Sequence, residues 1–343
     1  MRFLIPVIMP IMLCLNIHAQ NLIQSREKHF ANLRQLTFTG ENAEAYFSGD
    51  DSRLIFQSTR DEYKCDQIFV MNADGTDIKL VSNGRGRTTC AFFNPLGDNI
   101  IYASTYMENA TCPPPPSMEY GYVWAIYPGY DIFTANHDGS GLSVLTESRG
   151  YDAEAVYSPD GSLIAFTSTR DGDLEIYIMK SDGSEIRRVT DNPGYDGGAF
   201  FSPDGDRLVF RAQQFPAEAD LEEYKTLLKK DLVKPSRMEI YTINIDGTER
   251  KRITNNGAAN FAPYFHPSGE KIIFSSDLDN PREHNFELYL IDTDGENPER
   301  VTYSEQFDGF PMYSYGGDKI VFASNRNNGG TRLTNIFIAD WVE

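Results

Sequence analysis

The 343-residue chain is 40% hydrophobic and 13% aromatic, so it can bury a substantial core, and wholesale disorder is excluded. Its 50 acidic residues outnumber its 31 Lys and Arg residues, which gives a formal net charge of −19. This balance argues against nucleic acid and anionic membrane surfaces, which attract clustered basic residues, and it suits partners that are cationic, neutral or metal-bearing. The 27 Gly, 19 Tyr and 22 Phe residues favour strands and turns over helices.

The N-terminus, residues 1–19, is typical of a secretory signal peptide. Arg2 precedes an apolar run over residues 3–15, and the small residue Ala19 lies where cleavage is expected. The run is too short to span a bilayer and no other long apolar segment follows, so we expect no membrane span in the mature chain. A periplasmic or secreted location follows, and Cys14 leaves a lipoprotein as the alternative to a soluble protein.

The mature chain is expected to retain Cys65, Cys90 and Cys112. An odd number of cysteines in an oxidising compartment predicts one disulfide and one free thiol. The spacing of the three matches no zinc-binding pattern, and it does not select the bonded pair.

A repeated motif organises the rest of the chain. Tyr157-Ser-Pro-Asp-Gly161 precedes an apolar run, and Phe201-Ser-Pro-Asp-Gly205 repeats this pattern 44 residues later. The same frame occurs six times, beginning at Phe47, Phe93, Tyr157, Phe201, Phe265 and Tyr313. An Asp-Gly pair follows in the first five copies, at Asp74, Asp138, Asp182, Asp246 and Asp294.

Each copy is expected to form four short antiparallel strands, here A to D, because Asp-Gly between alternating runs predicts a tight hairpin. Four strands at a period of forty-odd residues are typical of a β-propeller blade. The sixth copy lacks strand D, and residues 33–37 resemble the missing strand. We therefore predict an all-β fold: one six-bladed β-propeller over residues 33–343, closed by the N-terminal strand that completes the last blade, with residues 20–32 as a lead-in.

The repeat resembles the PD40, or TolB-like (WD40-like), propeller repeat. The resemblance is carried by the Ser-Pro-Asp-Gly turn, by Ser-Thr-Arg-Asp-Gly at residues 168–172, by Glu175-Ile-Tyr177 and by the Asp-Gly turn, and it covers about residues 33–343. TolB is a periplasmic component of the Tol-Pal envelope system whose propeller receives a lipoprotein partner. TolB also has an additional α/β domain before its propeller, where this chain has only residues 20–32. The resemblance implies the fold, an envelope location and an envelope lipoprotein as a partner.

Two insertions enlarge one face of the predicted disc. In antiparallel blades the B-to-C and D-to-A connections lie on one face, and the other two connections lie on the opposite face. The extra length falls between strands B and C, at about residues 106–129 and 213–237. The second insertion is expected to hold a short amphipathic helix from about Ala217 to Lys230. Functional loops on a rigid scaffold commonly gather in this way.

Acidic residues recur near the expected channel mouth on this face. The candidate ligand-binding carboxylates are Glu44, Asp152, Glu154, Asp196 and Asp308. A ring of them would attract a cation, and Asp152, Glu154, Asp196 and Asp308 have the oxygen chemistry that binds Ca²⁺. The alternative is local, because an Asp in such a place often accepts hydrogen bonds that fix the start of its strand.

Aromatic residues of the first insertion are further candidates. Tyr122 and Trp124 can stack on sugars or grip a peptide, or they can pin the insertion to the disc. The chain has no His-Glu-x-x-His motif and no Gly-x-Ser-x-Gly elbow.

The first functional hypothesis is a non-catalytic propeller that binds a protein, peptide or glycan on the face with the insertions. The absence of a catalytic signature favours it. The alternative is a carbohydrate-active hydrolase or lyase that uses the carboxylates at the channel mouth.

Overall fold

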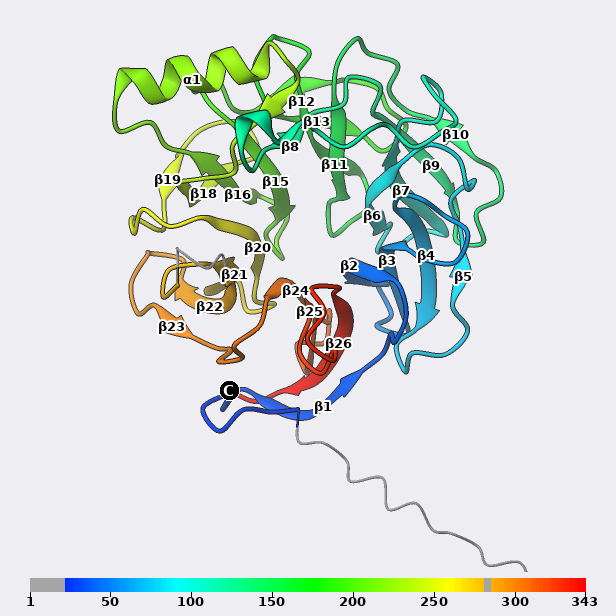
Figure 1. Ribbon diagram of the computed structural model, residues 1–343, viewed down its shortest axis with the longest axis vertical. Helices are drawn as coiled ribbons and strands as arrows, with labels where there is room; N and C mark the ends of the chain where they lie inside the picture. The colour runs from blue at the N-terminus through cyan, green and yellow to red at the C-terminus, as the bar shows by residue number, and fades with distance from the viewer. Residues whose placement is uncertain (1–21, 281–284) are drawn as a thin grey trace, which may run out of the picture.

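Six four-stranded antiparallel sheets form a ring in the computed structural model, which describes residues 22–280 and 285–343 (Figure 1). Each sheet is one blade, and its strands follow one another from the centre outward. The innermost strands are β2, β6, β11, β15, β20 and β24. The predicted six-bladed propeller is therefore confirmed, whereas the predicted signal peptide lies outside the described residues.

The blades share one pattern of strand lengths. Blade 1 comprises β2 (Glu41–Phe47), β3 (Arg53–Thr59), β4 (Gln67–Asn72) and β5 (Lys79–Leu80). Blade 2 comprises β6 (Thr88–Phe93), β7 (Asn99–Ser104), β9 (Asp131–Asn136) and β10 (Ser143–Val144). Blade 3 comprises β11 (Asp152–Tyr157), β12 (Leu163–Ser168), β13 (Glu175–Lys180) and β14 (Arg187–Arg188). Blade 4 comprises β15 (Asp196–Phe201), β16 (Arg207–Gln213), β18 (Met238–Asn244) and β19 (Lys251–Arg252). Blade 5 comprises β20 (Asn260–Phe265), β21 (Lys271–Ser276), β22 (Glu287–Asp292) and β23 (Glu299–Arg300).

The sixth blade joins the two ends of the ring. It comprises β24 (Asp308–Tyr313), β25 (Lys319–Ser324), β26 (Asn335–Trp341) and the N-terminal β1 (Phe30–Gln35). β1 pairs antiparallel with β26, so the predicted closure by the N-terminal strand is present, although the strand begins three residues before residue 33. The lead-in also packs on this blade, because the His29 ring stacks on Trp341 with a centroid distance of 4.7 Å.

Short-range contacts fix the outer hairpins. In each predicted Asp-Gly turn the Asp carboxylate accepts the backbone N–H two residues on, as in Thr76 N to Asp74 Oδ1 at 2.9 Å. The glycine that follows has a positive φ, +91° at Gly75, a conformation that other residues adopt at a cost. The predicted Asp-Gly turns are therefore confirmed. They could be predicted because each turn is determined by residues that are adjacent in the sequence.

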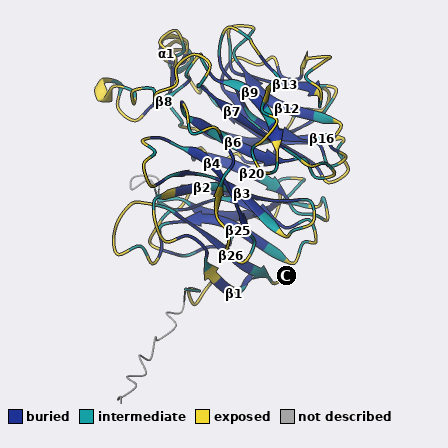
Figure 2. Ribbon diagram, turned by 90° about the vertical axis from the view of Figure 1, so that its right-hand side faces the viewer, coloured by how far each residue is buried: buried dark blue, intermediate teal, exposed yellow. Residues whose placement is uncertain are grey.

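One aromatic side chain on strand B of each blade is almost completely buried. These are the strand-B residues Phe56, Tyr102, Phe166, Phe210, Phe274 and Phe322, which are at most 2% exposed. Figure 2 shows buried strands throughout the thickness of the disc. Each ring belongs to a buried apolar cluster, so removing one would leave a cavity in the core.

A β-bulge recurs in every innermost strand. The pairing of strands A and B shifts register at one point in all six blades, for example between Ala43 and Tyr46. The bulged residues have φ between +49° and +60°. They are Glu44, Cys90, Glu154, Gly198, Ala262 and Phe310, here called the channel ring because all six line the central cavity. The bulge thus breaks the strand alternation and turns one residue per blade toward the axis, with a side chain in every blade except blade 4, where the residue is Gly198.

Candidate functional site

The two insertions meet over blade 3 and form one unit. β8 (Trp124–Ala125) pairs antiparallel with β17 (Leu232–Val233). Residues 106–129 and 214–237 are called the cap here, and α1 and β8 stand out from one side of the disc (Figure 2). The Tyr224 hydroxyl donates to Asp173 in the B-to-C loop of blade 3, which anchors the cap to the ring.

The predicted helix is present in the cap. α1 spans Glu218–Leu228, one residue later and two residues earlier than the expected ends. Ala217 is its N-cap residue, and Tyr224 and Leu227 are its buried side chains. None of the described helices has the length and apolar character needed to cross a bilayer.

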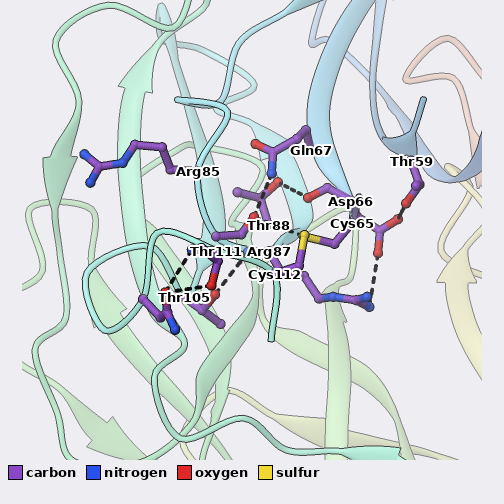
Figure 3. Close-up of a disulfide and its surroundings, with 12 residues drawn as sticks. Thr59, Cys65, Asp66, Gln67, Arg85, Arg87, Thr88, Thr105, Thr111 and Cys112 are labelled. Carbon is purple, nitrogen blue, oxygen red and sulfur yellow. Dashed lines mark hydrogen bonds and ion pairs between the residues drawn. A yellow bond between two sulfur atoms is a disulfide. The ribbon is translucent and has the colours of Figure 1, made fainter. Parts of the chain in front are cut away.

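A disulfide between Cys65 and Cys112 ties the cap to the B-to-C loop of blade 1 (Figure 3). The two Cα atoms are 5.9 Å apart, and Cys90 is the free thiol, so the expectation of one bond and one free thiol is confirmed. The backbone N–H of Gly86 donates to the Ala110 carbonyl at 2.8 Å and holds the same segment. The cap therefore has a second attachment, on the opposite side from Tyr224.

Reducing this disulfide is expected to loosen the cap and leave the blades intact. Chymotrypsin should then cut faster between residues 106 and 122, because a disulfide restrains the open ensemble of the loop that it closes. Time-resolved proteolysis with mass spectrometry measures this, with Cys65→Ser/Cys112→Ser as the permanent reduced form and Cys90→Ser as the matched control. Equal cleavage with and without reductant would contradict the assigned attachment.

Three of the predicted site carboxylates do not face the channel. Asp152, Asp196 and Asp308 begin their innermost strands and are at most 2% exposed. Their partners are Arg170 for Asp152 (3.0 Å), Arg250 for Asp196 (2.6 Å) and Arg326 for Asp308 (2.6 Å). Each Asp is thus held at the start of its strand, as the local alternative expects, but by an arginine side chain and not by the backbone N–H donors of that alternative.

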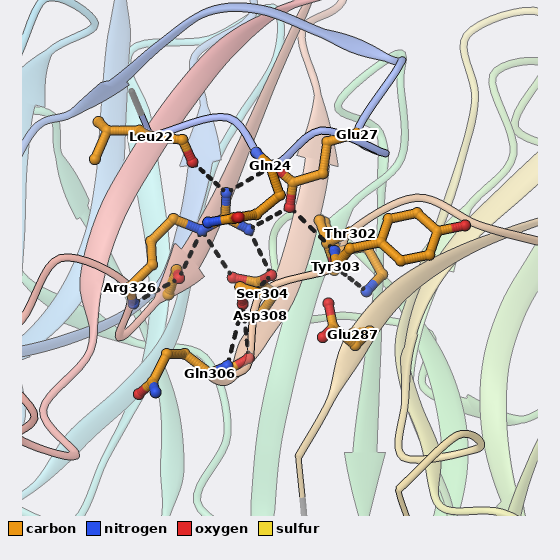
Figure 4. A network of polar contacts seen from close by, with 12 residues as sticks. Leu22, Gln24, Glu27, Glu287, Thr302, Tyr303, Ser304, Gln306, Asp308 and Arg326 are labelled. Atoms are coloured by element: carbon orange, nitrogen blue, oxygen red, sulfur yellow. Dashed lines mark hydrogen bonds and ion pairs between the residues drawn. The ribbon is translucent and has the colours of Figure 1, made fainter. Parts of the chain in front are cut away.

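The Asp308 pair extends into the lead-in. The Arg326 guanidinium lies between Asp308 and Glu27, with Nη2 3.0 Å from Glu27 Oε1 (Figure 4). Glu27 also accepts the backbone N–H of Tyr303 at 3.0 Å. Glu27 has no local sequence signal, because its partners Arg326 and Tyr303 are 299 and 276 residues away in the chain.

The four carboxylates expected to bind Ca²⁺ do not form one site. Over residues 22–280 and 285–343, no group of three or more His, Cys, Asp or Glu side chains is arranged to hold a metal ion. The expectation for Asp152, Glu154, Asp196 and Asp308 fails because three of the four are held by arginines at strand starts while Glu154 faces the channel.

A central cavity of about 1620 Å³ opens beneath the cap. The channel ring lines it, as do Tyr122 and Trp124 of the cap. Of the five predicted carboxylates, the cavity therefore receives Glu44 and Glu154. Its size is sufficient for a short stretch of polypeptide or several sugar units.

Glu154 is fully satisfied by its neighbours. Arg211 and the Tyr195 hydroxyl donate to its Oε1, and Thr167 and the Gly198 N–H donate to its Oε2. Burial opposes ionisation, but the Arg211 charge and these hydrogen bonds outweigh it and hold the pKa of Glu154 below its usual range. Glu154 is thus an ionised group with no free lone pair directed at a ligand.

Glu44 occupies the equivalent position in blade 1, in a different environment. Burial raises its pKa to about 7, and the main opposing contribution is a hydrogen bond from the Cys90 thiol. None of the described Lys, Arg or His residues forms an ion pair with it. The two glutamates of the channel ring therefore differ: Glu154 has a bonded counter-charge, and Glu44 has none.

Aromatic rings close the channel below the channel ring. Tyr46 of blade 1 and Phe200 of blade 4 meet across the axis with centroids 5.4 Å apart. Phe92 and Tyr264 contact Phe200 at 6.0 Å and 5.2 Å. These four residues are called the channel floor, and they make the cavity a funnel that is blind at its lower end.

Trp124 leans over the polar side of the funnel. Its ring lies 5.6 Å from the Arg211 guanidinium and 6.4 Å from the Tyr195 ring, and its Nε1 donates to the Tyr122 hydroxyl at 3.1 Å. Trp124 is half-buried, whereas Tyr122 is 67% exposed at the outer edge. Arg211 and Tyr195 were missed by the sequence reasoning, because they reach Glu154 from the next blade.

Exposed apolar side chains occur in the loops of the capped face. Of the large hydrophobic residues that are exposed in the described chain, six lie in loops of this face: Phe38, Met107, Met118, Tyr122, Leu278 and Leu333. The other four, Ile78, Leu96, Ile186 and Val342, lie in the turns of the opposite face or after the last strand there. The cap alone carries Met107, Met118 and Tyr122, and exposed apolar side chains of this kind are common where a surface contacts a macromolecule.

The closed ring, capped on one face and hollowed at its axis, defines a six-bladed β-propeller with a central cavity. A family model described as the TolB β-propeller domain (PD40) matches residues 128–227 and 228–340, more than half of the chain. The chain therefore belongs to the TolB β-propeller family.

Individual proteins agree with this assignment. The chain is 28% identical over 153 residues to the protein TolB homolog of Chlorobium luteolum, a match that spans 44% of this chain and 30% of that relative. Among solved structures, putative TolB from Agrobacterium tumefaciens has a TM-score of 0.56 at 20% identity, covering 89% of this chain and 91% of that one. Oligogalacturonate lyase from Vibrio parahaemolyticus has a TM-score of 0.56 at 13% identity, covering 93% and 95%. At these identities the two structures support the fold alone.

Proposed function

We propose that this protein is a non-catalytic binding propeller of the bacterial envelope that receives a segment of a partner protein in its funnel. The main support for this proposal is the funnel beneath the cap, whose lower end is closed by the aromatic rings of the channel floor. A closed lower end admits a loop or a chain end and excludes threading through the disc. The exposed apolar side chains of the cap, Met107, Met118 and Tyr122, support a protein partner, because they offer contact area beyond the funnel itself.

An envelope partner is supported by family membership and by the predicted signal peptide. A lipoprotein is the first candidate, since TolB propellers receive one. The location we propose is periplasmic or secreted, and Tyr122, Trp124, Glu44 and Glu154 are the proposed contact or supporting residues.

Photo-crosslinking from Tyr122 tests this proposal. A benzoyl-phenylalanine at position 122 should crosslink a discrete envelope protein in cells, and the same probe at Leu96 on the opposite face should not. Mass spectrometry of the adduct identifies the bound segment. Equal labelling from both positions would contradict a partner on the capped face.

Trp124→Ala is expected to weaken binding of that partner at least tenfold, because a large aromatic beside a pocket is the usual carrier of binding energy. Titration of the isolated partner segment measures the change, with Leu96→Ala as the control and circular dichroism as the check on folding. An unchanged affinity would remove the funnel mouth from the interface.

A carbohydrate-active hydrolase or lyase is the second candidate. Environments that push the pKa values of Glu44 and Glu154 apart favour it, since acid and base pairs are built this way. The four donors on Glu154 oppose it, because they occupy the lone pairs that a nucleophile or base needs. Turnover of polygalacturonate or another envelope glycan that is lost in Glu44→Gln would establish the enzyme.

A further inference from the structure

Glu44 is a carboxylate of the channel ring that has no direct counter-charge. Over the described ranges no basic side chain forms an ion pair with it, although the Arg211 charge lies near enough to lower its pKa. The nearby guanidinium of Arg211 is already bonded to Glu154 and to the Tyr195 hydroxyl. Glu44 is half-buried on the cavity wall, and a carboxylate in a partly desolvated position without a counter-charge favours a cation beside it.

Three basic groups at the cavity mouth are paired, whereas other lining residues such as Lys64, Glu305 and Arg332 are exposed and form no ion pair among the described residues. Arg87 lies 3.4 Å from Asp66, and Arg237 lies 3.1 Å from Asp220. Lys234 of the cap is bonded to Glu223. These groups belong to the loops and the cap, whereas Glu44 lies on the innermost strand, directly above the channel floor.

The adjoining wall of the funnel is apolar. Phe310 represents blade 6 in the channel ring, next to blade 1, and it contacts Phe261 and Phe307 at centroid distances of 5.6 Å and 6.2 Å. Phe286 completes this cluster, 4.7 Å from Phe261. All four rings line the cavity. One side of the funnel therefore offers a negative charge, and the adjacent side offers aromatic surface that extends from the channel ring toward the mouth.

We infer that the polypeptide segment received by the funnel carries a lysine or arginine side chain that pairs with Glu44, beside an apolar side chain that packs on the Phe261, Phe286, Phe307 and Phe310 cluster. This inference rests on the proposed function and names the chemistry of the ligand. The long apolar stem of a basic side chain suits the aromatic floor, and its charged end suits the ring. Arg211 does not repel it, because Glu154 balances that charge.

Selection of displayed peptides tests the inference without knowledge of the partner. A library of heptapeptides flanked on both sides by fixed sequence is selected against the whole protein, against Glu44→Gln and against Glu305→Gln, an exposed carboxylate that also lines the cavity. The native protein and Glu305→Gln should enrich peptides with Lys or Arg next to an apolar residue, and Glu44→Gln should not. An acetylated synthetic peptide from this set should lose affinity about 30-fold with Glu44→Gln, the order expected for a desolvated charge pair.

The outcomes separate this inference from the proposed function. In one outcome, the selected peptides lose affinity for the Trp124→Ala variant and yet contain no excess of Lys or Arg. That result would overturn the inference and keep the funnel as a peptide site. Binding that needs only a free peptide N-terminus would also overturn it. If no selected peptide depends on Trp124 or Glu44, both the inference and the proposed function fail. Glu44→Asp, which keeps the charge, should retain the basic preference.

Discussion

Glu44→Gln is expected to stabilise the folded protein at pH 8 while it removes the charge that binds the ligand. Burial raises the pKa of Glu44 from 4.5 to about 7. A carboxyl group with a raised pKa in the folded state favours folding below its unfolded pKa, and this advantage is lost as the pH rises toward the folded pKa. Above about pH 7 the native protein holds an ionised, unpaired carboxylate. A shift of this size corresponds to about 3 kcal/mol between pH 4 and pH 8.

Urea unfolding at pH 4 and pH 8 measures this effect. Glu44→Gln should be within about 1 kcal/mol of the native protein at pH 4 and about 2 to 3 kcal/mol more stable at pH 8. Burial also raises the pKa values of Glu175 and Glu287, but these groups are common to both proteins and cancel in the comparison. Glu305→Gln should show no pH-dependent difference. A stability gain that is equal at both pH values would contradict the unpaired state of Glu44.

A stabilising substitution at this position has a functional meaning. Residues that serve only the fold are expected to destabilise it when they are changed, whereas a group retained for binding can cost stability in the free protein. Glu44→Gln is nearly equal in shape and keeps the same backbone, so its effect reports the charge. Gain of stability with loss of the basic-peptide preference would together identify Glu44 as a ligand-binding residue.

The fold was predictable because its determinants are local and repeated. The Asp-Gly turns, the Ser-Pro-Asp-Gly turns and the alternating apolar runs each act within a few residues, and six copies reinforce one another. The sixth copy lacks its own strand D, and this absence predicted that the N-terminal strand completes the last blade. The positions of both insertions on one face followed from strand direction alone.

The site was only half predictable, because its environment is built from residues far apart in the sequence. Asp152 and Glu154 are two residues apart on one strand and were expected to share a role. The bulge after Ala153 leaves Asp152 buried against Arg170 and turns Glu154 toward the axis. A register shift of this kind has no signature in a single sequence, although it recurs in all six blades.

The arginines that pair with the buried aspartates were equally unpredictable from the sequence. Arg170 follows strand B of blade 3, but the arginine that pairs with Asp196 in blade 4 is Arg250, which directly precedes strand D. The disulfide follows the same logic. Cys65 and Cys112 lie in B-to-C connections of neighbouring blades on one face, whereas Cys90 lies on an innermost strand, a distinction that requires the ring to be closed first.

Glu154→Gln is expected to destabilise the protein by about 3 to 5 kcal/mol, although it is the same change at the same ring position as Glu44→Gln. It leaves the Arg211 guanidinium buried without a counter-charge, and breaking a buried pair from one side is strongly unfavourable. Arg211→Met should cost a similar amount, because Glu154 is then left with only neutral donors.

The double variant Glu154→Gln/Arg211→Met should lose much less than the sum of the two single changes, since it leaves neither charge exposed to the low-dielectric interior. Urea unfolding of all four proteins at pH 8 gives the coupling energy, which we expect to exceed about 2 kcal/mol. A sharper test compares the signs of the stability changes caused by Glu154→Gln and by Glu44→Gln. If Glu154→Gln and Glu44→Gln shift stability in the same direction, the ring does not contain one compensated and one uncompensated carboxylate, and the cationic ligand loses its physical basis.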